Sequence, residues 1–196
     1  MIPELPLPRF DPADAAAAAR RFAQSAPADV SYALVESPVG TLVAAATTRG
    51  LAGLHYADST GEVDAILERL AGRLSPRILE APARLDRVRR ELDEYFGGRR
   101  TEFDLDLDWA LVSGFGRRVL RATARIPFGE VATYAQVAAK AGSPRAYRAA
   151  GNALGANPMP IVVPCHRVLH SGGGLGGYTG GLDRKERLLR LEGVLA

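Results

Sequence analysis

The hydrophobic pattern of this chain changes near residue 108, and the change divides the sequence into two unlike parts. In the first part, three short apolar runs follow one another from Tyr32, separated by turn-forming residues at 37–40 and 49–50. Short strands joined by tight turns are typical of a β-meander. Beyond residue 108, apolar side chains recur at the spacing of three and four that marks helices. The sequence therefore predicts a sheet-containing part followed by a mainly helical part.

The first part is predicted to be a small α/β domain over 31–108 with an antiparallel sheet. Helical periodicity follows the meander at 61–74 and again at 83–96. Residues 103–108 then alternate apolar and acidic side chains, which predicts a strand with one buried face. Ahead of this domain, residues 1–30 contain five prolines around an alanine run, and we expect an extended arm with one short helix there.

The second part, 109–196, is predicted to contain a helix-turn-helix pair. A helix over 134–141 begins after the candidate N-cap Thr133 and ends at a glycine. The dipeptide Ser143-Pro144 supplies a cap and a first-turn proline for a second helix over 145–154. Two helices joined by a short turn that contains glycine match the helix-turn-helix arrangement.

Two further helices are expected to flank this pair. The first begins after Ser113 and ends before Pro127, because the residue that precedes a proline avoids helical angles. The second, over 184–191, follows a glycine-rich loop at 172–181 that lacks the residue order of a phosphate-binding motif. We interpret this loop as a flexible segment that closes a pocket.

The charge of the chain is distributed unevenly between the two parts. Residues 1–108 carry 13 basic and 18 acidic side chains, a net charge of −5, whereas residues 109–196 carry 12 and 4, a net charge of +8. A basic half beside an acidic one indicates contact with a polyanion, most often nucleic acid. No run is long and apolar enough to cross a membrane, and no secretory leader is recognisable. We therefore expect a cytoplasmic protein without a membrane partner.

The chain has a single cysteine, Cys165, and three histidines, which exclude an intramolecular disulfide and argue against a zinc site. We expect no metal and no cofactor. A lone cysteine is usually a buried apolar residue, but the polar His166 and Arg167 follow this one. A thiol becomes nucleophilic when a base or a positive field favours its thiolate. Four carboxylates of the second part are candidates to orient His166: Glu130, Asp183, Glu186 and Glu192.

The second helix of the predicted pair is slim. Half of its residues are alanine or glycine, it carries the basic Arg145 and Arg148, and it shows little beyond Arg148 and Asn152 that could face base edges. A helix that recognises bases in the major groove would carry several Arg, Asn or Gln side chains. Small residues with one arginine that can enter the base stack favour docking in the minor groove.

Several motifs of the chain occur together in one known family. They are Phe128-Gly129-Glu130-Val131-x-Thr133-Tyr134, Asn157-Pro158-x-Pro160, Pro164-Cys165-His166-Arg167-Val168 and Tyr178-Thr179-Gly180-Gly181-Leu182, with Lys185. With these motifs the chain closely resembles the O6-alkylguanine-DNA alkyltransferases over 113–193, and more loosely over 31–108. The resemblance implies a ribonuclease-H-like fold for the first domain, and a second domain that binds DNA and accepts an alkyl group.

The resemblance also implies roles for individual residues. Four would be catalytic: Cys165 as the alkyl acceptor, His166 as a proton relay through water, Glu192 as the group that orients His166, and Tyr134 as a donor to guanine. Arg148 would be the finger that replaces the flipped nucleotide. The other implied DNA-binding residues are Thr133, Tyr134, Arg145, Ala149, Gly151 and Asn152. The implied substrate pocket comprises Leu154, Asn157, Pro160, Val168, Tyr178 and Thr179, where the family often has serine in place of Thr179.

The implied function is direct reversal of DNA damage. After minor-groove binding and base flipping, the alkyl group of O6-alkylguanine, or of O4-alkylthymine, would pass irreversibly to Cys165, once per molecule. The partner would be double-stranded DNA that carries the lesion, bound by a monomer, with cooperative binding left open. Two alternatives remain. A helix-turn-helix regulator would bind one operator sequence with a large specificity ratio, and a Cys-His hydrolase would normally have its histidine far from the cysteine in sequence.

Overall fold

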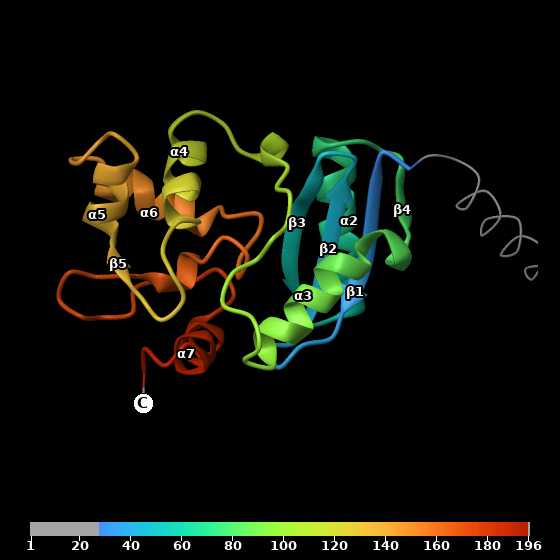
Figure 1. Cartoon of the computed structure of the whole chain (residues 1–196). Coiled ribbons are helices and arrows are strands. Elements are labelled where there is room, and N and C mark those ends of the chain that lie inside the picture. The colour runs from blue at the N-terminus through green and yellow to red at the C-terminus, as the bar shows by residue number, and fades with distance from the viewer. Residues whose placement is uncertain (1–27, 196) are drawn as a thin grey trace, which may run out of the picture.

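The computed structural model describes residues 28–195, so most of the predicted arm over 1–30 lies outside the described residues. The first part forms a four-stranded sheet in the order β3-β2-β1-β4 (Figure 1). Its strands are β1 (Val30–Val35), β2 (Thr41–Thr47), β3 (Gly50–Ala57) and β4 (Ile78–Glu80). β1, β2 and β3 pair antiparallel, which confirms the predicted meander. β4 pairs parallel to β1, so the expected antiparallel sheet is wrong for this strand, whose three residues are too few to show an alternating pattern.

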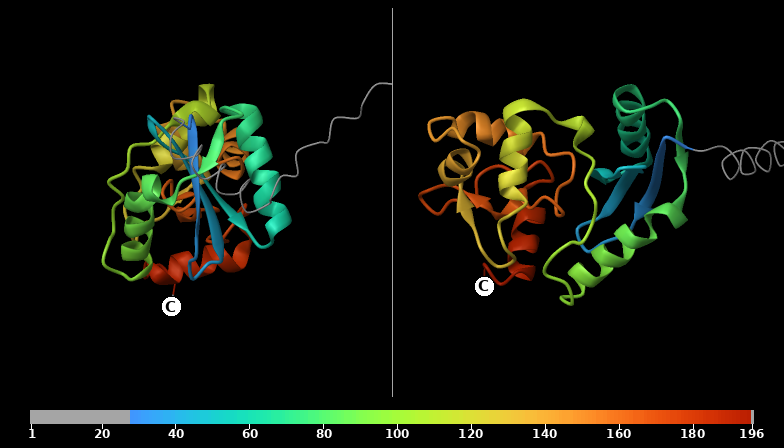
Figure 2. Two further views of the ribbon diagram at one scale, coloured as in Figure 1. Left: turned by 90° about the vertical axis from the view of Figure 1, so that its right-hand side faces the viewer. Right: turned by 45° about the horizontal axis from the view of Figure 1, so that its top comes forward.

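Two helices, α2 (Thr60–Arg73) and α3 (Asp86–Phe96), cover opposite faces of this sheet (Figure 2). Neighbouring residues of β2 point to different faces, so Val43 packs in the cluster beneath α2 and Leu42 in the cluster beneath α3. The predicted helix over 83–96 begins with a 3-10 turn, η1 (Pro82–Leu85), before α3 starts. Both faces of the sheet are therefore buried.

The predicted strand over 103–108 is not formed. This segment makes only one isolated parallel bridge, in which Leu51 N donates to Asp106 O and Asp108 N donates to Leu51 O, each at 2.8 Å. Phe103, Leu105 and Leu107 are half-buried against the core, so the alternating pattern marks a buried side of an extended segment. Alternation predicts which side chains are buried, but it does not establish that the backbone pairs along its length.

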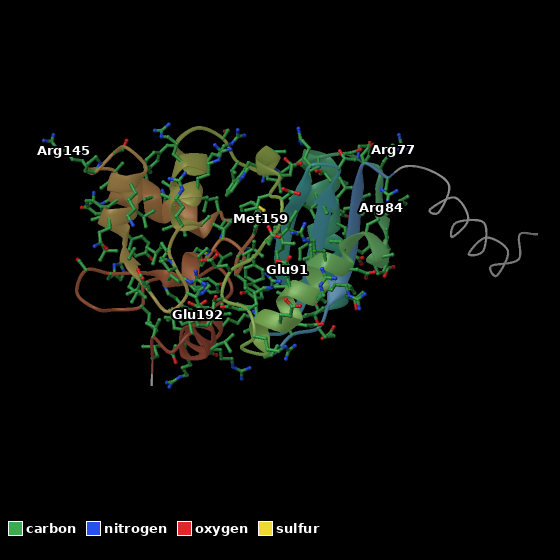
Figure 3. The ribbon with its side chains drawn as sticks, viewed as in Figure 1. Arg77, Arg84, Glu91, Arg145, Met159 and Glu192 are labelled. Atoms are coloured by element: carbon green, nitrogen blue, oxygen red, sulfur yellow. The ribbon has the colours of Figure 1, made fainter. Side chains whose placement is uncertain are left out.

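The second part is built mainly of helices. Its elements are η2 (Trp109–Leu111), α4 (Gly114–Thr123), β5 (Ala132–Thr133), α5 (Tyr134–Lys140), α6 (Tyr147–Gly155), η3 (Cys165–Arg167), β6 (Val168–Leu169) and α7 (Leu182–Leu191). β5 and β6 form a short parallel pair that brings the start of α5 beside the segment after Cys165. Arg145 lies at the end of the molecule away from the sheet (Figure 3).

The caps of the helices agree with the sequence in one case and differ in others. Thr133 is the N-cap of α5, as predicted, and the structure adds a reciprocal bond from Gln136 that completes a capping box. The next helix, α6, begins at Tyr147 and not at 145, because Ser143 and Pro144 form a separate turn in which Ala146 N donates to Ser143 O. Ser113 occupies the N-cap position of α4 without a side-chain capping bond, and α7 begins two residues before the predicted 184.

One hydrophobic core joins the two parts. Leu54 of β3 and Leu92 of α3 belong to the same buried cluster as Met159 and Val163, which lie on the segment that leads to Cys165. Leu54 N also donates to Pro158 O at 2.7 Å. The sheet therefore supports the cysteine segment directly (Figures 1 and 3). Among residues 28–195, the structure contains no helix with the length and apolar character that crossing a membrane requires.

Candidate active site

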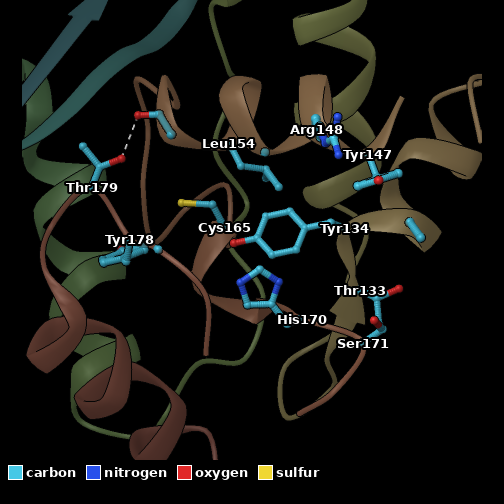
Figure 4. A pocket seen from close by; sticks show the side chains of 14 residues that line it. Thr133, Tyr134, Tyr147, Arg148, Leu154, Cys165, His170, Ser171, Tyr178 and Thr179 are labelled. Atoms are coloured by element: carbon cyan, nitrogen blue, oxygen red, sulfur yellow. Dashed lines mark hydrogen bonds between the residues drawn. The ribbon is translucent and has the colours of Figure 1, made fainter. Parts of the chain in front are cut away.

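A cavity of about 610 Å³ lies between α5, α6 and the glycine-rich loop (Figure 4). It is lined by Thr133, Tyr134, Ala135, Tyr147, Arg148, Gly151, Leu154, Gly155, Cys165, His170, Ser171, Gly177, Tyr178 and Thr179. Half of the ten predicted catalytic and pocket residues therefore meet around one space, namely Tyr134, Leu154, Cys165, Tyr178 and Thr179. The sulfur of Cys165 lies between the rings of Tyr134 and Tyr178 (Figure 4).

Asn157 holds the cysteine segment in place. Its side-chain amide donates to Cys165 Sγ at 3.1 Å and to Val163 O at 2.8 Å, while its Oδ1 accepts from Met159 N at 3.0 Å. Ile161 has a positive φ of 75°, which costs a β-branched residue about 1–3 kcal/mol and requires firm support from its surroundings. Asn157 lies two residues after the end of α6, so these bonds connect the position of the thiol to the end of that helix.

The thiol of Cys165 is protonated in the resting protein. Burial raises the pKa of Cys165 to about 11, against the opposing effects of the hydrogen bond from Asn157 and the positive charge of Lys185. Burial also lowers the pKa of Lys185 to about 8. The local positive field therefore does not make a thiolate by itself, and the thiol needs a base to remove its proton.

His166 is the candidate for that base. Its Nε2 lies 2.9 Å from Glu192 Oε1, and both side chains are fully buried. Burial alone would raise the pKa of Glu192, but hydrogen bonds from His166 and Arg167 lower it to about 2. Burial lowers the pKa of His166, so a neutral imidazole donates its Nε2 proton to the carboxylate and keeps a lone pair on Nδ1.

The side chains of Cys165 and His166 are hydrogen-bonded to other residues and not to each other. Within the described residues, His166 Nδ1 is buried without a hydrogen-bond partner, and Nε2 is bonded to Glu192. Nδ1 can therefore accept a hydrogen bond from a water, and the predicted relay through water stays a prediction. Of the four candidate carboxylates, the one that meets His166 is Glu192.

Two further residues bind the same carboxylate. Tyr95 of α3 donates its hydroxyl to Glu192 Oε1 at 2.5 Å, and Arg167 donates from Nε to Oε2 and from Nη2 to Oε1, both at 2.8 Å. Arg167 also donates to Ile126 O. The sequence did not indicate Tyr95, because its apolar helical spacing predicts an ordinary core residue. The first domain thus contributes a side chain to the buried hydrogen-bond network around Glu192.

Three predicted pocket residues do not line the cavity. Asn157, Pro160 and Val168 are buried behind it. The carbonyl of Val168 accepts a hydrogen bond from Lys185 Nζ at 2.7 Å, and Lys185 Nζ also donates to Leu175 O. The buried residues Asn157 and Val168 therefore act on the pocket by holding the backbone that forms its inner wall. Residues 28–195 hold no group of three or more His, Cys, Asp or Glu side chains that could bind a metal ion.

The predicted DNA-binding side chains lie around the mouth of the cavity and on the outer side of α6. Arg145, Arg148, Ala149 and Asn152 are exposed. Gly151 is half-buried, and a Cβ there would lie 3.7 Å from the ring of Tyr134, which is an ordinary van der Waals contact. Arg145 precedes α6, in contrast to its predicted place inside the helix.

Two rim residues were not predicted from the sequence. Tyr147 is 48% exposed, and the guanidinium of Arg148 lies 5.7 Å from the centre of its ring. His170 packs against Tyr134 with ring centroids 5.2 Å apart. Neither residue stands in a motif, and only the folded loop brings His170 to the cavity.

Comparisons with known proteins agree with this geometry. Residues 114–194 match the DNA binding domain of 6-O-methylguanine DNA methyltransferase, and residues 30–109 match its ribonuclease-like domain. A methylated-DNA–protein-cysteine methyltransferase of Mycolicibacterium paratuberculosis is 43% identical over 83% of this chain and 92% of its own length. One of Methanosarcina barkeri is 37% identical over 82% of this chain and 96% of its own.

Solved structures show the same similarity. The crystal structure of the O6-methylguanine methyltransferase of Mycobacterium tuberculosis superposes with a TM-score of 0.71 at 37% identity, and covers 85% of this chain and 94% of its own. A structure titled as the M. tuberculosis OGT in complex with DNA superposes with a TM-score of 0.70 at 37% identity, and covers 83% of this chain and 92% of its own. The chain therefore belongs to the methylated-DNA–protein-cysteine methyltransferase family, with a sheet-and-helix N-terminal domain and a helical C-terminal domain.

Proposed function

We propose that this protein repairs DNA by transferring the alkyl group of O6-alkylguanine to Cys165. The observation that carries the proposal is the cavity in which the Cys165 thiol lies beside Tyr134, with the His166–Glu192 pair buried next to the cysteine. A nucleophile, a base oriented by a carboxylate and a hydroxyl donor are the groups that this displacement requires. The family match and the DNA complex of a relative support DNA as the partner.

The reaction is a displacement at the alkyl carbon. A bridging water carries the thiol proton of Cys165 to His166 Nδ1, and Sγ attacks the carbon as its bond to O6 breaks. The departing guanine takes a proton from the hydroxyl of Tyr134, which regains it from solvent, so the proton lost by the thiol is balanced by the proton gained by the base. Burial, with the charge of Cys165 as a smaller cause, raises the pKa of Tyr134 and keeps this hydroxyl protonated.

Transfer happens once per molecule. The product is a thioether, which has no thiol-exchange route back to the thiol, and the chain has no second cysteine to resolve it. The alkyl group of O4-alkylthymine sits on the same kind of aryl ether oxygen, so we include it as a second substrate. The acceptor is therefore consumed and the reaction is stoichiometric.

DNA is bound through α5 and α6, which act as a helix-turn-helix unit of the second domain. The small residues of α6 suit a close approach to the minor groove. The alkylated base must leave the stack to reach Cys165, because a paired base cannot enter a cavity. Arg148, exposed at the mouth of that cavity, fills the vacated position. The protein acts as a monomer, and the first domain has a ribonuclease-H-like fold.

The proposal is tested by stoichiometry. A duplex with one O6-methylguanine is incubated with increasing protein, and the lesion that remains is quantified after digestion of the DNA. We expect lesion loss to equal the amount of protein added and then to stop. Continued turnover would indicate a hydrolase. Tight binding to one sequence without loss of the lesion would favour the regulator.

Arg148→Ala is expected to slow repair of duplex DNA much more than reaction with free O6-benzylguanine. A finger that fills the vacated stack stabilises only the flipped duplex, by an amount on the order of a few kcal/mol. Rates on the two substrates are compared with those of Arg145→Ala. This control removes an exposed cation outside the helix, and should weaken binding to all duplexes alike in a salt-dependent way. Equal losses on both substrates for Arg148→Ala would place this residue in base recognition instead.

A further inference from the structure

The wall of the cavity formed by Tyr178 is attached to the first domain. Tyr178 lies on the glycine-rich loop, and its hydroxyl is hydrogen-bonded to the hydroxyl of Tyr56 on β3 at 2.8 Å. The two rings also meet edge to face, with centroids 6.1 Å apart and an interplanar angle of 66°. A residue of the sheet therefore contacts the cavity wall through both its ring and its hydroxyl.

The backbone of the loop packs directly on Tyr56. A Cβ added at Gly180 would lie 2.5 and 2.8 Å from two ring carbons of Tyr56, and 2.9 Å from the ring of Tyr178. These distances are shorter than a side-chain carbon can tolerate, so Gly180 is the residue that allows this close approach. The backbone at Gly180 therefore packs closely against the rings of both Tyr56 and Tyr178.

Arg184 at the start of α7 holds Tyr56 from the other side. Its guanidinium carbon lies 4.6 Å from the centre of the Tyr56 ring, a cation–π contact. The same guanidinium donates to Val39 O at 2.7 Å and to Gly180 O at 3.0 Å, and pairs with Asp58. One cation therefore links β3, the turn between β1 and β2, and the glycine-rich loop around the Tyr56 ring.

The position of Tyr178 matters because it faces the reacting groups. Tyr178 lines the cavity, and its ring stands perpendicular to that of His166, with centroids 6.5 Å apart. The adjacent Thr179 is fixed separately, through a hydrogen bond from its hydroxyl to Gly155 O at 2.7 Å. Without the bond to Tyr56, the Tyr178 hydroxyl would lose the partner that holds its ring at the cavity.

We propose that Tyr56 is a positioning residue for substrate binding: its hydroxyl holds Tyr178 so that the cavity is shaped for the alkylated base before the base arrives. Tyr56 does not line the cavity, so it acts through Tyr178. The inference rests on the proposed function and extends it, since it assigns the first domain a part in substrate recognition. Losing one hydrogen bond of this kind is expected to raise the half-saturating concentration of substrate about three- to tenfold.

A double-mutant cycle tests this inference in the full chain. Tyr56→Phe, Tyr178→Phe and the double variant are each reacted with free O6-benzylguanine, and benzylation is followed by mass against concentration of the base. Both single substitutions remove the same hydrogen bond. We therefore expect each to raise the half-saturating concentration, and the double variant to be no worse than the singles. The limiting rate is expected to change little, because neither hydroxyl touches the reacting atoms.

Tyr32→Phe is the matched control. It removes a tyrosine hydroxyl from β1 of the same sheet, away from the cavity, and should leave both kinetic constants unchanged. Losses that add in the double variant, or an unchanged half-saturating concentration in Tyr56→Phe, would overturn the inference and leave the proposed function intact. A parent protein that takes up no benzyl group would instead overturn the proposed function, and this inference with it.

Discussion

Cys165→Ser is expected to abolish alkyl transfer and to leave binding to duplex DNA nearly unchanged. Serine keeps a side chain of similar size that can still accept the hydrogen bond from Asn157, so the cavity is retained. A hydroxyl is a far weaker nucleophile than a thiol near neutral pH, even with His166 as its base. The remaining O6-methylguanine in the DNA measures transfer, and fluorescence anisotropy of a labelled duplex measures binding.

Ser171→Ala provides the control for this substitution. Ser171 lines the same cavity and is exposed at its rim, so the control changes a hydroxyl of the cavity without touching the acceptor. It should transfer the alkyl group at close to the parent rate. If the serine variant of Cys165 still cleared the lesion, another group would be the acceptor and the proposed chemistry would be wrong.

Glu192→Ala is expected to cause the largest loss of stability. The carboxylate accepts hydrogen bonds from Tyr95, His166 and Arg167 in a buried site, and its removal leaves the guanidinium buried without a counter-charge. Breaking a buried ion pair in this way costs about 3–5 kcal/mol. At roughly 2–4 °C per kcal/mol, the fall in Tm is easily measured. Alkyl transfer should also slow, because His166 is no longer oriented.

Glu186→Ala is the control that separates the loss of the Glu192 hydrogen-bond network from a general effect of removing a negative charge. The pH dependence of stability is a second test. Glu186 lies on α7 and is half-exposed, so its removal should change stability by at most about 0.5 kcal/mol.

The folded pKa of Glu192 lies below its ordinary value of 4.5. Its stabilisation is therefore present above pH 4.5 and is lost as the pH falls towards about 2. Glu192→Gln should lack this part of the acid sensitivity. An identical pH dependence in the two proteins would contradict the assignment.

Local signals in the sequence predicted local structure well. The apolar runs between tight turns predict the meander, and Thr133 immediately before a helical pattern predicts the N-cap of α5. Each of these features is determined by residues within a few positions of one another. The segment over 103–108 shows the limit of this approach, since its alternation reports burial on one side and pairing needs a neighbouring strand.

Contacts between distant parts of the chain could not be predicted in this way. Tyr95 reaches Glu192 and Tyr56 reaches Tyr178 only because the sheet domain packs on the cysteine segment. Both tyrosines stand in apolar patterns that indicate ordinary core residues. His170 reaches the cavity through the fold of the loop that carries it. The sequence predicts candidate reacting groups from their motifs, and the fold determines which side chains hold those groups in place.

The central claim is that Cys165 itself receives the alkyl group. The protein is incubated with an O6-methylguanine duplex, its intact mass is measured, and the modified residue is located by peptide sequencing in the mass spectrometer. We expect a gain equal to one methylene group per molecule, at Cys165 alone, and no gain with an unmodified duplex. An unchanged protein mass after the lesion has disappeared, or a methyl group at another residue, would contradict the claim.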